Sequence, residues 1–433
     1  MANDKDFTLK EGIEVGGSTK NSLGTISASN AVDLSTGNYF THTPAGPTTY
    51  SFTNPGAVQS FQMQLTGGQE AVANSFNTTL YSGNGGTQSI NTGIDLAGDG
   101  GLVWTKCRNN THDHHLFDTE RGVLKRLRTN SEATEHSEAN SLTAFNSNGH
   151  TLGSEYAHNG STQNFVSWTF KKTPKFFDVQ TVTTDSSGNA TVNHDLGSSP
   201  GFVIVKGLNV TDGWYCFHVD RGVNKFTNIN TSDVETSFAA WTNVSSTSFG
   251  LTFGSTTYAN KNMVLYLFGH DTTADSMIKC GSYAGNGTAT NAINLGWTPQ
   301  FVLLKEYSNS SGGGQSWHLF DSARGAGTSG NDPYLRPSSA GDEQGSNIDN
   351  IDFTSTGFTL KRSDGAVNGS GDNYIYVAIR SAAATSITYP SSVKFQGGIA
   401  PQTPANGETD LLTFSTKDGG TSYTGVHSID NAS

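Results

Sequence analysis

The chain has 433 residues, of which only 14% are charged, and it carries 51 glycines and a formal net charge of −12. The negative charge argues against nucleic acid and anionic membranes as partners, because both need a basic binding face. The length allows about two to four domains of ordinary size. Short runs rich in Thr, Val and Phe alternate with Gly, Asn and Ser turns, and this pattern predicts an all-β protein.

The two ends of the chain carry strand patterns of their own. Residues 1–19 lack the apolar stretch of a secretory signal, and we expect them to form a short extended arm. The segment STGNYFTHTPAGPTTYSFTN predicts two aromatic, Thr-rich strands, and LLTFSTKDGGTSYTGV predicts two more around an Asp-Gly-Gly hairpin turn. Because four strands can share an apolar face, we predict that residues 20–69 and 385–433 form one small split β domain.

The middle of the chain is a threefold repeat. The segments LAGDGGLVWTK, LGSSPGFVIVK and LGWTPQFVLLK begin at Leu96, Leu196 and Leu295 and have equal length. Each copy closes on an apolar run without alternation, namely NFVSWTF, NMVLYLF and NYIYVAI. Such runs predict strands that are buried on both faces.

These patterns predict three tandem antiparallel β-sandwich repeats inserted between the two ends, at residues 70–174, 175–272 and 273–384. Lys106, Lys206 and Lys305 should then fall at equivalent strand positions. We expect each repeat to carry its own core and to fold independently.

An Arg-Gly step occurs at the same place in every repeat, in HLFDTERG, CFHVDRG and HLFDSARG. The residue three before the arginine is acidic in the first and third copies and His218 in the second. A catalytic acid could survive in some copies only, but the shared pattern favours a structural corner between a strand and a turn. The corner residues are Asp118, Arg121, Arg221, Asp321 and Arg324.

The stretch NNTHDHH raises a metal hypothesis. His112 and His114 would point the same way on a strand and could give imidazole ligands to one ion at a threefold axis. The alternative is a polar loop, and no other repeat has the cluster, so we favour neither a metal nor any other cofactor.

Enzymatic motifs are also missing from the sequence. Hydrolysis of a glycan needs two carboxylates about 5–10 Å apart, and Asp118 with Glu120 is one candidate pair. The other repeats lack the glutamate, and the chain has no His-Glu-x-x-His or phosphate-loop motif. We therefore expect a protein that is not an enzyme. The cysteines Cys107, Cys216 and Cys280 are odd in number and far apart, which predicts buried thiols.

The segments LVWTK, HLFDTERG, SLTAFNSNGHTLGS and FVSWTF resemble a β-rich, lectin-like module of virion proteins from marine bacteriophages, cyanophages especially. The ends, including DFTLKEGIEVGG, DLSTGNYFTHT and SVKFQGGIAPQTPANGETDLLTFSTKDGG, resemble tail-fibre modules of the same phages. This resemblance implies a virion structural protein, specifically a tail fibre or similar appendage that displays lectin-like modules for attachment to a host surface. A capsid decoration or spacer protein without glycan binding is the alternative, and a hydrolase of host polysaccharide is the third.

The resemblance supplies no binding residues, but aromatic side chains beside Asn and Asp can hold a sugar ring. Trp214, Trp297 and Trp317 lie in turn-rich stretches, so we predict that they are exposed platforms for a glycan. The expected partners are other virion proteins, copies of the same chain in a homotrimer, and host surface polysaccharide. The expected location is the virion, assembled in the host cytoplasm.

Overall fold

The computed structural model describes residues 22–27, 29–42, 48–66, 72–273, 276–309, 314–328, 330–345, 347–382, 387–398, 400–401 and 409–429. The predicted N-terminal arm, residues 1–19, lies outside the described residues. The described chain is almost entirely β, as predicted, and divides into two units. We call residues 72–382 the repeat unit, and residues 1–71 together with 383–433 the end unit.

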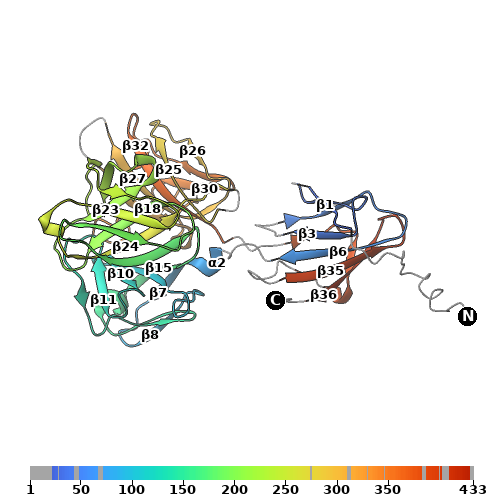
Figure 1. Cartoon of the computed structure of the whole chain (residues 1–433), viewed down its shortest axis with the longest axis horizontal. Helices are drawn as coiled ribbons and strands as arrows, with labels where there is room; N and C mark the ends of the chain where they lie inside the picture. The colour runs from blue at the N-terminus through green and yellow to red at the C-terminus, as the bar shows by residue number, and fades with distance from the viewer. Residues whose placement is uncertain are drawn as a thin grey trace, which may run out of the picture. The chain divides into compact units, whose positions relative to one another are not determined.

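The end unit joins strands from the two ends of the chain. At its centre, β6 (Gln59–Thr66) pairs antiparallel with β35 (Thr409–Thr416) along the full length of both strands. Figure 1 shows the blue strands β3 and β6 beside the red strands β35 and β36. The predicted Asp-Gly-Gly turn connects β35 to β36 (Tyr423–Ile429) as a hairpin.

Three sheets make up the end unit. Their strand orders are β3-β6-β35-β36-β34, β1-β2-β5 and β33-β4. The remaining strands are β1 (Thr25–Ile26), β2 (Ala31–Asp33), β3 (Tyr39–His42), β4 (Thr48–Thr49), β5 (Ser51–Thr53), β33 (Ile387–Thr388) and β34 (Val393–Phe395).

One core holds the two ends together. Every second residue of β6 and β35 is buried, which is the pattern of strands with one face towards a core. Phe61 and Phe414 stack across the pair with ring centroids 5.0 Å apart, and Phe52 packs edge-on against both. Side chains more than 300 positions apart in the sequence therefore form a single apolar cluster.

The first repeat has a six-stranded sheet in the order β12-β11-β10-β9-β15-β7 and a three-stranded sheet in the order β13-β14-β8. Its elements are α2 (Val72–Ser75), β7 (Phe76–Ser82), β8 (Gln88–Asn91), β9 (Gly101–Cys107), β10 (His115–Asp118), β11 (Lys125–Arg128), β12 (His136–Ser137), β13 (Leu142–Asn146), β14 (Gly149–Leu152), α3 (Tyr156–Asn159) and β15 (Asn164–Lys171).

The second repeat has the same two sheets, β21-β20-β19-β18-β24-β16 and β22-β23-β17. Its elements are β16 (Phe177–Thr183), β17 (Asn189–Asn193), β18 (Pro200–Gly207), β19 (Trp214–His218), η2 (Val219–Arg221), β20 (Lys225–Asn228), β21 (Thr236–Ser237), β22 (Trp241–Thr242), β23 (Ser248–Thr252), η3 (Thr256–Tyr258) and β24 (Asn262–Gly269).

The third repeat keeps this order with one strand fewer, as β29-β28-β27-β32-β25 and β30-β31-β26. Its elements are β25 (Ile278–Ala284), β26 (Asn291–Asn294), β27 (Pro299–Ser308), β28 (His318–Asp321), η4 (Ser322–Arg324), β29 (Tyr334–Leu335), β30 (Ile351–Thr354), β31 (Gly357–Leu360) and β32 (Asn373–Arg380).

Strand register shows that the repeats are equivalent in detail. Lys106 of β9 lies opposite the third residue of β15, Lys206 of β18 opposite the third residue of β24, and Lys305 of β27 opposite the third residue of β32. The three lysines therefore occupy the same position, as the sequence alignment predicted.

Each large sheet is buried on both faces, which explains the apolar runs without alternation. Along β9, Val103 points into the sandwich core of its own repeat, between the large and the small sheet. Leu102 and Trp104 point the other way, into a second core. The same division occurs in β18 and β27, since successive side chains of a strand point to opposite faces.

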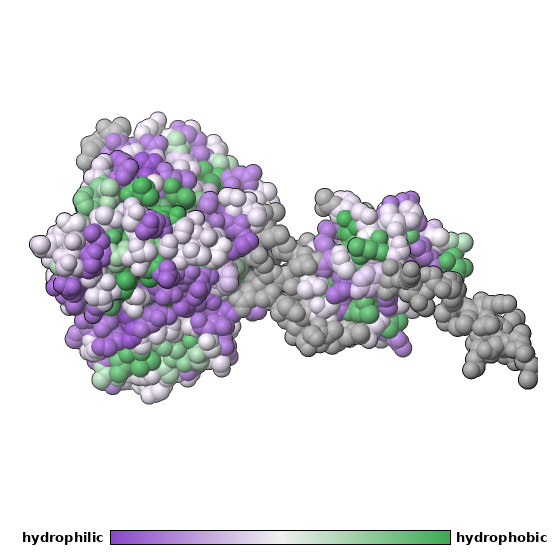
Figure 2. Space-filling view, in the orientation of Figure 1, coloured by the Kyte–Doolittle hydropathy of each residue, from purple (hydrophilic) through white to green (hydrophobic). Residues whose placement is uncertain are grey.

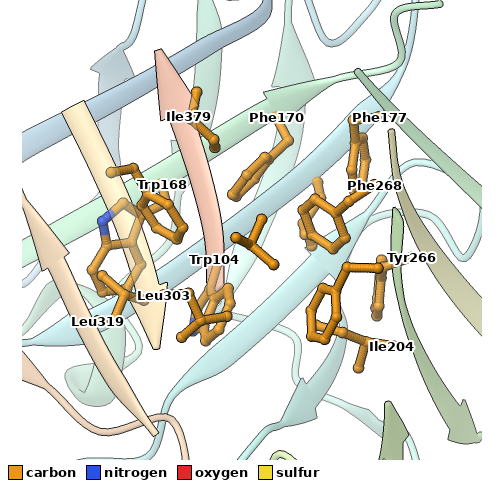
Figure 3. Close-up of a cluster of buried hydrophobic side chains, with 14 of the residues drawn as sticks. Trp104, Trp168, Phe170, Phe177, Ile204, Tyr266, Phe268, Leu303, Leu319 and Ile379 are labelled. Carbon is orange, nitrogen blue, oxygen red and sulfur yellow. The ribbon is translucent and has the colours of Figure 1, made fainter. Parts of the chain in front are cut away.

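The second core is shared by all three repeats. It contains Trp104 and Trp168 from the first, Ile204 and Tyr266 from the second and Leu303 from the third, among others. Figure 3 shows these side chains lying together between strands of the three repeats. This shared core argues against independent folding of each repeat, because a repeat alone would expose this apolar face to water.

On the face drawn in Figure 2, hydrophobic residues of the repeat unit occur in small groups among hydrophilic ones. The three cysteines are buried and carry free thiols, as predicted. Within the described part of the chain, no helix is long and apolar enough to cross a membrane.

Candidate functional site

Three matching junctions close the repeats into a ring. The backbone N–H of Glu135 in the first repeat donates to the Leu208 carbonyl of the second at 3.0 Å. The N–H of Glu235 in the second donates to Tyr307 of the third at 2.9 Å, and the N–H of Glu343 in the third donates to Arg108 of the first at 2.8 Å. Each repeat therefore donates a hydrogen bond from the same backbone N–H position and accepts one at the same carbonyl position.

The Arg-Gly corners lie at these junctions. In the first repeat, Arg121 Nε donates to Asp118 Oδ2 at 2.6 Å, and the Arg121 backbone N–H donates to Asp118 Oδ1 at 2.9 Å. The Tyr266 hydroxyl of the second repeat donates to the same Oδ2 at 2.8 Å. The carboxylate thus uses both oxygens within the protein, one of them across the junction.

The third repeat builds the same corner with different chemistry across the junction. Arg324 Nε donates to Asp321 Oδ2 at 2.6 Å, and Trp168 Nε1 of the first repeat donates to the same oxygen at 2.9 Å. Both members of this ion pair have fully buried side chains.

In the second repeat, His218 replaces the acid, and its Nε2 lies 3.1 Å from the Tyr376 carbonyl of the third repeat. Arg221 consequently lacks the partner that Asp118 and Asp321 provide in the other two corners, and it pairs with Glu235 at 2.7 and 2.9 Å. Its guanidinium also lies over the Tyr307 ring of the third repeat, 3.8 Å from the centroid. All three corners thus contribute to holding neighbouring repeats together.

The equivalent lysines are buried at the same junctions. Lys206 Nζ donates to the Glu132 carbonyl of the first repeat at 2.9 Å, and Lys305 Nζ donates to the Ser232 carbonyl of the second at 2.9 Å. Lys106 Nζ donates to the Cys107 carbonyl at 2.6 Å. Burial lowers the pKa of each lysine to about 8.

The prediction that three tryptophans are exposed platforms for a glycan is wrong. Trp214, Trp297 and Trp317 are buried, with exposed fractions of 0%, 4% and 1%. Their indole N–H groups donate within the protein: Trp214 to the Ser131 carbonyl of the first repeat at 3.0 Å, Trp317 to the Asn228 carbonyl of the second at 2.9 Å, and Trp297 to Ser276 Oγ at 3.0 Å. A turn-rich sequence around a tryptophan indicated exposure, but the neighbouring repeat covers two of these rings.

The two candidate metal ligands do not lie on one strand face. β10 begins at His115, so His112 and His114 precede it. His114 is buried, and its Nδ1 accepts a hydrogen bond from Trp104 Nε1 at 3.0 Å. Among the residues that the structure describes, no group of three or more His, Cys, Asp or Glu side chains is placed to hold a metal ion.

His112 instead lines a polar pocket of the first repeat, which sequence reasoning missed. The pocket has a volume of about 230 Å³, and its lining is Thr111, His112, Asp113, His115, Arg126, Glu155, Ala157 and Ala340. His158 lies behind it, with its ring centroid 4.1 Å from that of His115. The HDHH stretch was the one available sequence signal, but the glutamate and arginine come from distant segments.

Several buried polar atoms at this pocket have no hydrogen-bond partner within the described chain. They are His112 Nε2, His115 Nδ1 and Arg126 Nε. Glu155 Oε2 and His158 Nε2 make no hydrogen bond of good geometry, but they lie 3.3 Å from each other. Burial lowers the pKa of His158 to about 3 and that of His115 well below its usual range, so both imidazoles are neutral at pH 7. Burial also raises the pKa of Glu155. This concentration of unpaired polar atoms makes the pocket our candidate functional site.

The chain belongs to the family described as "Domain of unknown function (DUF7483)", whose model matches residues 72–382. The match coincides with the repeat unit. No curated protein matches the chain. A solved structure titled "Crystal Structure of the STIV MCP" has 8% sequence identity and covers 47% of this chain and 95% of that chain. Its TM-score of 0.18 is too low to support an argument about fold or function.

Replacing Arg324 by Met should destabilise the repeat unit by about 3–5 kcal/mol, because the change leaves the buried carboxylate of Asp321 without its cation. Arg362→Met is the matched control. Arg362 pairs with Asp364 at the surface, where an ion pair contributes about 0–1 kcal/mol. Urea unfolding followed by tryptophan fluorescence measures both free energies. Equal losses for the two variants would contradict the assigned role of the corner.

Acid should destabilise the repeat unit steeply. Burial lowers the pKa of His150, His158 and His318 to about 3 and of His218 to about 4, and lowers His114 and His115 well below the usual range. Because the unfolded chain binds these protons near pH 6.5 and the folded chain does not, the stability is complete above that pH and is lost as the pH falls. Each histidine contributes a loss of up to about 1.4 kcal/mol per pH unit.

Burial raises the pKa of Glu155, Asp332 and Glu306, which opposes this effect, but these are three groups against six. Differential scanning calorimetry at a series of pH values should show the melting temperature of the repeat unit falling between pH 6.5 and about 5. A melting temperature that is constant over this interval would contradict the neutral, buried state of the histidines.

Proposed function

We propose that this protein is a non-enzymatic structural protein of a bacteriophage virion, specifically a tail fibre or similar appendage that presents the repeat unit to a host surface. The observation that carries the proposal is that the repeated polar side chains form contacts between repeats. The corners, which are the strongest candidates for chemistry in the sequence, have their hydrogen bonds directed to neighbouring repeats, while one polar pocket of the first repeat retains unpaired groups.

The same observation weighs against a polysaccharide hydrolase. Asp118 has no exposed surface and accepts hydrogen bonds from Arg121 and Tyr266, so it cannot reach a glycosidic oxygen. Glu120 is held by Lys172 at 3.0 Å. The pair of carboxylates considered from the sequence therefore serves the fold.

The division into two units supports separate tasks for attachment and display. The end unit contains the segments that resemble tail-fibre modules, and we assign it to contacts with other virion proteins. The repeat unit has its own cores, and only 14% of the residues of the chain are charged, which suits contact with uncharged host polysaccharide.

We also propose that the protein assembles as a homotrimer through the end unit. Thin β-modules gain stability by burying faces against copies of themselves. The repeat unit already does this within one chain, so the end unit is the part left to associate. Multi-angle light scattering on the full chain should give the mass of three chains, and a monomer at micromolar concentration would contradict this assembly.

Immunogold electron microscopy of intact particles, with antibodies raised against the repeat unit, tests the function itself. We expect label on the tail, and we expect the purified protein to bind host cells without releasing reducing sugar. Label confined to the capsid, together with no binding to cells, would favour a decoration or spacer protein. Reducing-sugar release would overturn the non-enzymatic assignment.

A further inference from the structure

We infer that the polar pocket of the first repeat binds a small uncharged molecule rich in hydroxyl groups, of the size of a single sugar ring. This inference rests on the proposed function and deepens it, since it gives the chemical class of the host ligand and its site. The pocket is the one lined by His112, His115, Arg126 and Glu155.

The pocket's unpaired groups require a partner. His115 in its lining is almost fully buried and has a ring nitrogen without a hydrogen bond, as does His112. His158 lies behind the pocket, with its Nε2 3.3 Å from Glu155 Oε2. Arg126 Nε is also unpaired. A buried polar atom left without a partner costs about 1–3 kcal/mol, so a fold that keeps several together has a reason to do so.

The charge balance of the pocket favours a neutral ligand. Arg126 and Glu155 face each other with Nη1 and Oε1 3.6 Å apart, and Arg128 pairs with Asp113 at 3.0 Å. The buried imidazoles are uncharged at pH 7, because burial holds their pKa values low. The two cations and the two anions of these pairs balance each other, so the pairs present no excess charge to a ligand.

The mixture of donors and acceptors favours hydroxyl groups. A neutral imidazole offers one N–H donor and one acceptor nitrogen, a guanidinium donates, and a carboxylate accepts. A hydroxyl group both donates and accepts, so a polyhydroxylated ring can satisfy all of these groups at once. The volume of about 230 Å³ lies just below the range of about 300–1,000 Å³ that holds drug-sized ligands, and it suits one ring.

The second repeat shows how the same position looks when its polar groups are satisfied. Tyr215 and Tyr258 stand where the first repeat has His115 and His158, and their hydroxyls lie 2.7 Å apart. The Tyr215 hydroxyl also donates to Asp212, the counterpart of His112, at 2.9 Å. These three side chains bond to one another.

The third repeat satisfies the position in another way. His318, the counterpart of His115, lies 2.9 Å from the Ser316 carbonyl through Nδ1, and the Tyr334 ring packs against it at 4.8 Å. Val367 stands in place of His158. The repeats are aligned here by Asn159 and Asn368, whose side-chain amides make matching hydrogen bonds. Only the first repeat, among the described parts of the three, combines these positions into a cluster of unpaired polar atoms.

An exposed aromatic ring stands beside the pocket. Tyr156 is 53% exposed, and its ring centroid lies 5.4 Å from that of His112. Its hydroxyl accepts a hydrogen bond from Gln163 Nε2 at 2.9 Å, which fixes the ring. A tyrosine face held in this way can pack against the C–H groups of a sugar ring.

Saturation-transfer NMR with the methyl glycosides of glucose, galactose and mannose, on the full chain, tests the inference. We expect saturable signals from at least one glycoside, and at least about tenfold weaker binding by Glu155→Gln. Asp364→Asn is the matched control. Asp364 is the counterpart of Glu155 in the third repeat, and each carboxylate accepts a hydrogen bond from the backbone N–H two residues later.

A second variant fills the pocket without relying on a single charge change. The combined change His112→Asp, His115→Tyr, Arg126→Phe and His158→Tyr copies the second repeat, so it should fold, raise the melting temperature and abolish binding. Absence of binding by the wild-type chain would overturn the inference and leave ordered water as the partner of the unpaired atoms. Binding that survives in the filled variant would overturn the site, and a melting temperature raised by Zn²⁺ but by no glycoside would assign the pocket to a metal.

The outcome is separable from that of the proposed function. If the filled variant lacks glycoside binding but still binds host cells, this pocket is not the attachment site and the inference fails as an account of attachment. If particle labelling places the protein on the capsid while the glycosides bind this pocket, the proposed function fails and the sugar site stands.

Discussion

The central core shared by the three repeats is the constraint on which the rest of the structure depends. Each large sheet covers one face with its own small sheet and must cover the other face with its neighbours, because residues such as Trp104, Ile204 and Leu303 lie on that other face. Burying large apolar side chains contributes about 1.5–3 kcal/mol each, so three sheets that meet around one axis stabilise one another. A repeat unit of this kind cannot lose a repeat without exposing the core.

Closure of the ring then determines where polar side chains can lie. The corners and the lysines lie at the junctions between repeats, where Asp118, Asp321, Lys206 and Lys305 each form a hydrogen bond with a group of a neighbouring repeat. The second junction differs because His218 cannot supply the two acceptor oxygens of a carboxylate. Arg221 therefore pairs with Glu235. The same geometry is reached with three sets of residues, which shows that the junction position matters more than any one side chain. The pocket at His112 lies outside this scheme, and for that reason it stands out.

The sequence predicted the strands well and the contacts between repeats poorly. The spacing of Lys106, Lys206 and Lys305 and the apolar runs predicted the repeats, because strand periodicity and internal repetition are local signals. Trp214 and Trp317 were misplaced, because their environment is built by the preceding repeat and leaves no trace near them in the sequence. The sequence indicated only part of the pocket. His112 was a candidate ligand from its sequence pattern, whereas Arg126, Glu155 and His158 come close to it only in the folded chain.

Native-state hydrogen exchange tests the shared core most directly. The backbone amides of β9, β18 and β27 lie in the middle of the three large sheets, one in each repeat. If the repeats depend on one core, these amides exchange only through unfolding of the whole repeat unit, with the same free energy and the same dependence on denaturant in all three strands. Three different free energies, with one repeat opening while the other two stay protected, would contradict the account.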